Sequence, residues 1–333
     1  MIPVYSTWLA SHGKLWYDDK WYRLAWIAWP QAIALLAVLW FWAMPSTSRN
    51  AQWAKPVDAS ARSHQLAALR DAAKTGRTAM DSLERDARGG EMEAEFFYGT
   101  LFDPNFKLST IVQPDASKAL DWYGKAAAEG HESALNNLAV AYYEGVYTRA
   151  DFTRACFYAR KLSNNAYHGG LRVKGDCYSG GLGGTPVDMT QAANAYEMSA
   201  TKGDWRAEAA LGYFYERGLG GKERNSEIAL KHYRNAADKG DALGLHNLGS
   251  AYNSGLLGLQ RDGAEAARLI LKALEAKYDF TVRSLTTRPE IWTADFWQNL
   301  QRRLEEKGLY GGPTDGQPNP ATLDAVRRLG SRT

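Results

Sequence analysis

The sequence predicts an all-α protein, built mainly as an α-solenoid of stacked helical hairpins. Alanine recurs at one position of a repeated pattern, with separations of 36, 37, 37 and 37 residues, at Ala119, Ala155, Ala192, Ala229 and Ala266. Within each copy, small and apolar residues lie three and four positions apart, which is the spacing of one helix face. Glycine follows most of these faces, as expected where a helix stops. A hairpin with one apolar face cannot bury it alone, so neighbouring hairpins must stack.

The first segment, residues 1–23, is rich in aromatic side chains, with Trp8, Trp16, Tyr17, Trp21 and Tyr22. Aromatic rings with interspersed charges are typical of an amphipathic segment that lies on a membrane surface. We expect this segment on the cytoplasmic surface of a membrane. Docking onto a partner membrane protein is the alternative.

Residues 24–44 form an uncharged apolar run, LAWIAWPQAIALLAVLWFWAM. The run is long enough to cross a hydrocarbon core, and it has tryptophans near both ends, where interfacial aromatic residues belong. It therefore predicts a transmembrane helix. A cleaved signal peptide is rejected, because the run is long, starts late and lacks a small-x-small cleavage site after Met44.

The charges around this helix give a slight orientation signal. Lys14, Lys20 and Arg23 precede it closely, whereas Arg49, Lys55 and Arg62 follow at greater distance. Because positive flanks tend to stay in the cytoplasm, we expect a cytoplasmic N-terminus and an exported C-terminal body.

A polar stretch with two prolines, residues 45–60, is interpreted as a linker. Residues 61–90 then show helical spacing over 61–74 and 77–88 and end in two glycines. We predict a capping hairpin here, since the end of a solenoid needs a modified unit.

Residues 91–280 are the predicted solenoid, and each copy holds two half-motifs. The first reads Ala134-x3-Leu138-Ala139-x2-Tyr142-x2-Gly145 and recurs from Gly170, Ala207 and Gly244. The second runs from Ala119 to Gly130 and recurs from Ala192 and Ala229. A divergent copy starting at Ala94 makes five. This pattern resembles Sel1-like repeats, relatives of the tetratricopeptide repeat, and the resemblance implies a surface that binds peptides or proteins. The tyrosine of the first half-motif is expected to fill the gap between hairpins.

The C-terminal residues 281–333 resemble a peptidoglycan-binding domain. Leu300-Gln301, Leu304, Gly308, Tyr310, Gly312-Pro313, Asp315-Gly316, Pro320, Thr322 and Ala325-Val326 match the family pattern. Pro318-Asn319 replaces the usual aromatic-glycine pair, and the last helix is short. The resemblance implies Tyr310, Asp315, Asn319 and Thr322 as glycan-binding candidates, although an aspartate and a threonine at positions 315 and 322 are more often residues of a turn and a helix cap than glycan contacts. We expect this tail to matter more for wall retention than for folding.

Catalytic chemistry finds little support in the sequence. The six histidines stand in unrelated places, with no His-x3-His or Cys-x2-Cys pair, so we predict no metal site, no cofactor and no enzymatic activity. The glycine-rich loop 179–185 lacks the Gly-Lys-Ser/Thr ending of a phosphate cradle and is interpreted as a turn between helices. The formal net charge of +3 gives no polyanion-binding bias, so nucleic acid is not an expected partner.

The two cysteines fall on neighbouring predicted helices. Cys156 lies on the second helix of one repeat and Cys177 on the first helix of the next, at axial levels that differ by about 5 Å. A disulfide is possible in an oxidising compartment, and buried free thiols are the alternative.

Taken with the two resemblances, these features predict a scaffold of the bacterial inner membrane with a periplasmic body. It would bind protein partners, among them a membrane-protein complex, through its repeats and tether that complex to peptidoglycan. The alternatives are a periplasmic regulator of a membrane sensor and an accessory of a cell-wall-modifying enzyme.

Overall fold

The computed structural model describes residues 59–106, 109–164 and 166–331. Residues 1–58 lie outside that range, and with them the predicted segment 1–23, the transmembrane helix 24–44 and nearly all of the linker 45–60. No helix in the described part of the chain is both long and apolar enough to span a bilayer. Contacts within the chain divide it into two compact units, residues 1–64 and 65–333, and all the repeats and the C-terminal helices belong to the second unit.

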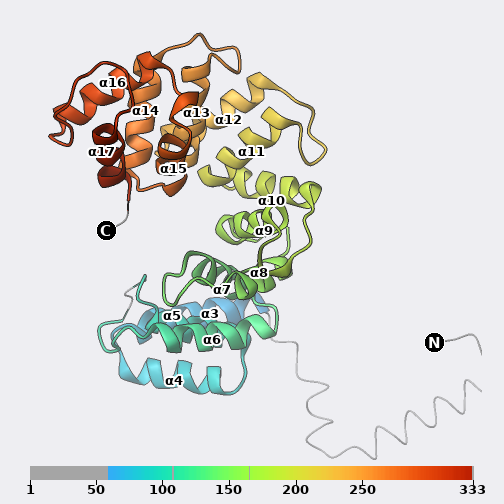
Figure 1. Cartoon of the computed structure of the whole chain (residues 1–333). Coiled ribbons are helices and arrows are strands. Elements are labelled where there is room, and N and C mark those ends of the chain that lie inside the picture. Colours follow the sequence, from blue (N-terminus) through green and yellow to red (C-terminus); the bar gives the residue numbers. More distant parts are fainter. Residues whose placement is uncertain (1–58, 107–108, 165, 332–333) are drawn as a thin grey trace, which may run out of the picture. The chain divides into compact units, whose positions relative to one another are not determined.

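The described chain is helical throughout, as predicted (Figure 1). The capping hairpin consists of α3 (Ala59–Ala73) and α4 (Arg77–Arg88). The five repeats follow as α5 (Met92–Phe102) and α6 (Ala116–Ala128), α7 (Glu132–Glu144) and α8 (Phe152–Lys161), α9 (His168–Gly180) and α10 (Met189–Thr201), α11 (Trp205–Arg217) and α12 (Ser226–Asp238), and α13 (Ala242–Ser254) and α14 (Gly263–Glu275). A short 3-10 helix, η1 (Leu182–Gly184), connects α9 and α10.

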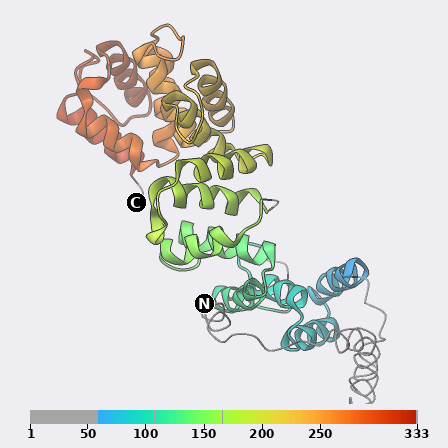
Figure 2. The same cartoon turned by 90° about the vertical axis from the view of Figure 1, so that its right-hand side faces the viewer.

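Each repeat is a hairpin whose two helices pack on one another and on the next hairpin, as Figures 1 and 2 show. In four of the five repeats the helices approach closely because glycine occupies the first helix at the crossing point, and the second repeat has Ala139 there. A Cβ added at Gly212 would lie 2.5 Å from ring atoms of Tyr233, and one added at Gly175 would lie 2.5 Å from the ring of Tyr196. The small residues of the sequence pattern are therefore sites of close packing.

In the first, third and fourth repeats the buried partner at this crossing is a tyrosine of the second helix, whereas the second and fifth repeats have Ala159 and Ile270 at that position. Tyr123, Tyr196 and Tyr233 are at most 3% exposed, and their hydroxyls donate to Asp103, Asp176 and Glu216 near the end of the preceding helix, at 2.7–2.8 Å. Three of the first-helix tyrosines expected to fill the gap between hairpins, Tyr178, Tyr215 and Tyr252, are instead only partly buried. The second-helix tyrosine fills the space between the helices because it lies opposite a glycine.

Helix ends follow local chemistry that repeats with the same period. In each repeat, a side-chain oxygen caps the N-terminus of the second helix. The capping residues are Asp115, Asp151, Asp188, Asn225 and Asp262. Each accepts from the backbone N–H three residues on, which satisfies a donor that the helix leaves open. The first helices of the last four repeats end on left-handed glycines such as Gly145, at φ 66°. Lys277 takes the same conformation, at φ 56°, and its Nζ donates to the Leu329 carbonyl at 2.6 Å.

After the repeats come α15 (Asp279–Thr287), η2 (Pro289–Ile291), α16 (Ala294–Glu306) and α17 (Pro320–Gly330). Phe296 and Trp297 of α16 are almost fully buried in a core that also contains Ile270 and Leu274 of α14. The tail therefore completes the last repeat and covers its second helix. The tail thus contributes to the core, and the expectation that it matters more for wall retention than for folding stays a prediction.

Candidate functional site

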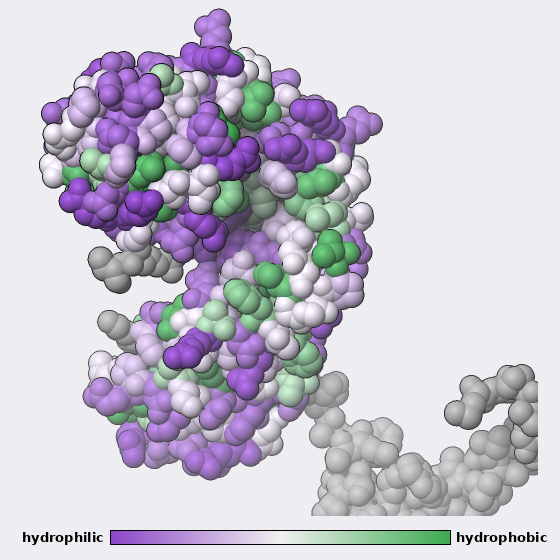
Figure 3. All heavy atoms as spheres, viewed as in Figure 1, coloured by the Kyte–Doolittle hydropathy of each residue, from purple (hydrophilic) through white to green (hydrophobic). Residues whose placement is uncertain are grey.

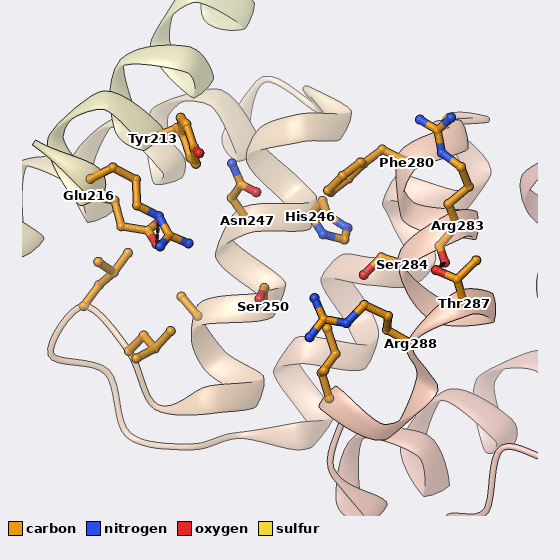
Figure 4. A pocket seen from close by; sticks show the side chains of 15 residues that line it. Tyr213, Glu216, His246, Asn247, Ser250, Phe280, Arg283, Ser284, Thr287 and Arg288 are labelled. Carbon is orange, nitrogen blue, oxygen red and sulfur yellow. Dashed lines mark hydrogen bonds and ion pairs between the residues drawn. The ribbon is translucent and has the colours of Figure 1, made fainter. Parts of the chain in front are cut away.

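A pocket of about 490 Å³ opens between the first helices α11 and α13 and helix α15. Each helix contributes residues three or four positions apart, because such residues share one face. Figure 4 shows the lining side chains, which are Tyr213, Glu216 and Arg217 from α11, His246, Asn247, Ser250 and Ala251 from α13, Leu256 and Leu257 after it, Phe280, Arg283, Ser284 and Thr287 from α15, and Arg288 and Ile291 at η2. No single segment of the sequence forms this site.

Positive charge predominates among these residues, with three arginines and one glutamate. The glutamate is already engaged: Glu216 accepts from the Tyr233 hydroxyl at 2.8 Å and lies 3.4 Å from Arg217. Arg288 pairs with Glu290 at 3.8 Å, and both side chains are 69% exposed, so that pair holds the guanidinium only weakly. In Figure 4 the Arg288 guanidinium extends between α13 and α15 toward Ser250.

The base of the pocket is polar and uncharged. His246 is 5% exposed, and its Nδ1 lies 3.1 Å from the Thr281 hydroxyl. Burial lowers the pKa of His246 to about 4, so the ring is neutral near pH 7. Asn247, Ser250 and Ser284 are partly exposed, and the described residues provide no hydrogen-bond partner for their side chains. The pocket therefore offers donors that are open to a ligand.

Large apolar side chains surround these polar groups. Tyr213, Leu256, Phe280 and Ile291 are between 43% and 52% exposed, although residues of these types are usually buried. The space-filling view in Figure 3 shows apolar and polar surface interleaved along the repeats. A pocket with apolar walls and a few placed polar groups is the usual form of a binding site.

Three of the four glycan-binding candidates contact one residue that was not itself a candidate, Gln301, and the fourth, Asn319, contacts two of those three. This side chain is fully buried, and its amide lies 3.5 Å from the Tyr310 hydroxyl, 3.4 Å from Asp315 and 3.2 Å from the Thr322 hydroxyl. It also donates to the Gln317 carbonyl at 2.7 Å and accepts from the Gly316 N–H at 2.9 Å. Gln301 thus holds together the loop between α16 and α17.

The four candidates differ in what they present to solvent. Tyr310 and Thr322 are buried, and Tyr310 donates to the Pro313 carbonyl at 2.8 Å. Asn319 caps α17 by accepting from the Thr322 N–H at 2.9 Å, while its amide donates to Tyr310 at 3.0 Å. Asp315 is exposed and accepts from the Gln317 N–H at 2.9 Å. Glycan binding at this loop stays a prediction, with Asp315 and the partly exposed Asn319 as its accessible members.

A disulfide joins Cys156 of α8 to Cys177 of α9, with Cα atoms 5.7 Å apart and both residues fully buried. It connects the second repeat to the third. The glycine-rich loop ends α9 and forms η1, and a side chain at Gly183 would overlap the Phe152 carbonyl. The loop is packed against α8 as an inter-helix turn.

A charge network around the buried Arg172, which the sequence analysis also missed, joins three first helices. Arg172 of α9 is 8% exposed at its side chain and contacts Glu144 at 3.0 Å, Asp176 at 2.9 Å and Asp204 at 3.7 Å. Arg206 of α11 contacts Glu144 at 2.6 Å. Since each charge has partners, this network ties α7, α9 and α11 together. Across the described ranges, no cluster of three or more metal-ligating side chains occurs.

Comparison with known proteins identifies the repeats. The sequence pattern described as the Sel1 repeat matches residues 93–131, 132–167, 175–204, 205–241 and 242–278, which are the five predicted copies. No match was found among curated proteins.

Two solved structures resemble the fold. One is c5321, a protective antigen of uropathogenic Escherichia coli that displays an SLR fold, at 24% identity and a TM-score of 0.50 over 86% of this chain. The chain spans 64% of that antigen's length, just under two thirds. A Sel1 repeat protein from Oxalobacter formigenes is 23% identical, with a TM-score of 0.47, over 72% of this chain and 96% of its own.

Proposed function

We propose that this chain, which belongs to the Sel1 repeat family, is a non-enzymatic scaffold that binds a protein partner through the first helices of its repeats. The observation that carries the proposal is the open pocket between α11, α13 and α15, where exposed apolar side chains surround unpaired polar groups. Monomeric proteins rarely expose such a combination without a use for it. Stacked hairpins are also suited to extended binding surfaces, because each unit adds to the last.

The proposal places the body of the protein in the periplasm of a bacterial inner membrane. Residues 24–44 would be the single membrane span, with residues 1–23 in the cytoplasm. The charge bias around the span supports this orientation. The disulfide between Cys156 and Cys177 supports it independently, because disulfides persist in oxidising compartments.

Contact with the cell wall is the second part of the proposed role. Its support is the peptidoglycan-binding pattern of residues 281–333, in which Gln301 fixes the loop that presents Asp315. A partner complex held by the repeats would then be tethered to peptidoglycan by the C-terminal tail.

The experiment that tests the scaffold role is photo-cross-linking with the full-length chain in cells. A photoreactive amino acid replaces Tyr213 at the pocket, and in a matched variant it replaces Glu227, which is exposed on α12. Purification in mild detergent and mass spectrometry identify what is captured. We expect a defined membrane-protein partner from position 213 and not from position 227. The same products from both positions, or none from either, would contradict the proposal.

A further inference from the structure

The pocket between α11, α13 and α15 has a charge and a shape that restrict what it can bind. Arg217 and Arg288 are 60% and 69% exposed, and Arg283 is exposed at the rim. Glu216 is the one acidic lining residue, and it is occupied by Tyr233 and Arg217. Even if Glu290, the partner of Arg288, is counted, positive charge remains in excess. The pocket is therefore complementary to a negative group.

The donors at the base complete an anion site. Guanidinium groups bind carboxylates through charge-assisted hydrogen bonds, which are stronger than neutral ones. Asn247, Ser250 and Ser284 add donors from two facing helices, and His246, which is neutral near pH 7, adds no charge of its own. Figure 4 shows the Arg288 guanidinium drawn between the Ser250 and Ser284 side chains, on the side of the pocket formed by α13 and α15.

The walls decide which kind of anion fits. A phosphate or another small free anion would leave the exposed apolar side chains of Tyr213, Phe280 and Ile291 uncovered. A protein segment that alternates acidic and apolar residues would satisfy both surfaces at once. Specificity would follow because a segment without an acidic side chain would cover these arginines and leave them unpaired.

We propose that this pocket binds an internal segment of a partner protein, inserting an aspartate or glutamate side chain between Arg217 and Arg288 while flanking apolar residues cover Tyr213, Phe280 and Ile291. This rests on the proposed scaffold function and assigns the chemistry of the segment that the scaffold recognises. Removing one charge-assisted hydrogen bond between an arginine and the acidic side chain should weaken binding by about tenfold or more.

The test uses random dodecapeptides displayed on phage, internal to the coat protein so that none has a free C-terminus. The full-length chain is the bait. Recovered peptides are synthesised with both ends blocked, and their dissociation constants are measured by fluorescence anisotropy. The test variant replaces Arg217, Arg283 and Arg288 by Gln. The control replaces Arg149, Arg224 and Arg302 by Gln, three exposed arginines outside the pocket that alter net charge equally.

We expect peptides enriched in acidic residues beside apolar ones. Replacing their acids by the amides, or using the test variant, should weaken binding at least tenfold, while the control variant changes it less than twofold. Recovered peptides without acidic enrichment, peptides that bind the test variant equally, or no peptide preferring the native chain over the test variant would each overturn the pocket assignment. The scaffold role fails separately, when photo-cross-linking from position 213 captures no partner.

Discussion

Replacing Gly212 by Ala tests whether close helix approach sets the geometry of the repeats. The added Cβ would lie 2.5 Å from Cδ1 and Cε1 of Tyr233, against 3.4–4 Å for ordinary contact. Tyr233 is fully buried and its hydroxyl is held by Glu216, so the ring has no free direction in which to move. Overpacking of this kind costs about 1–3 kcal/mol, and we take the upper end because the ring is fixed.

The same substitution has an opposing local effect, which the matched variant isolates. Glycine to alanine inside a helix stabilises it by about 1 kcal/mol. A Cβ at Gly124, within α6, would meet nothing within 4 Å. Gly124→Ala should therefore stabilise the protein by about 1 kcal/mol, while Gly212→Ala should destabilise it by about 2 kcal/mol.

Urea unfolding of the two full-length variants, followed by circular dichroism, measures this difference of about 3 kcal/mol in the free energy of unfolding. Changes in the unfolded chain are alike for both variants and cancel in the comparison. Tyr233→Leu gives the companion test, since the methyl at 212 should cost less when the ring is absent. If Gly212→Ala stabilises as much as Gly124→Ala, the crossing is not tightly packed and the reasoning fails.

Four further outcomes are expected. Because burial lowers the pKa of His246 to about 4, below its unfolded value, its stabilising effect is complete above pH 6.5 and is lost as pH falls toward 4. The unfolding free energy should therefore rise by about 3 kcal/mol from pH 4 to pH 6.5. In His246→Gln this dependence of the unfolding free energy on pH should be absent, and a pH profile equal to that of the native chain would refute the role of His246. Reduction of the Cys156–Cys177 disulfide should cost about 3 kcal/mol and lower the melting temperature; two titratable thiols in native protein denatured without reductant would show that the bridge is absent. Alkaline phosphatase fused after Thr333 should be active if the body is periplasmic; a silent fusion with an active cytoplasmic reporter at the same point would reverse the topology. The full-length chain should sediment with purified sacculi, and Asp315→Asn, which keeps an oxygen to accept from the Gln317 N–H, should reduce that fraction with little change in melting temperature; retention equal to that of the native chain would remove the Asp315 carboxylate from the glycan contact.

The sequence by itself determined the repeat architecture, because its signals are local and periodic. The predicted helix 77–88 is α4 (Arg77–Arg88), and the five predicted copies are the five that match the Sel1 repeat. Spacing by three and four fixes a helix face, and glycine fixes its end, without reference to distant residues. The same period placed Cys156 and Cys177 on adjacent antiparallel helices, although their pairing depended on Cα separation and side-chain direction.

Only the tertiary structure decided which residues of different helices contact one another. The second-helix tyrosines, rather than those of the first helix, are the fully buried ones, because glycine lies opposite them across the hairpin. Gln301, on α16, contacts Asp315 and Thr322 from outside the loop that carries the glycan-binding candidates. Arg217 and Arg288 line the same pocket from positions 71 residues apart, and neither is marked by any motif in the sequence. A repeat period specifies which face of each helix is buried, but which exposed groups meet across the stack depends on how successive hairpins pack.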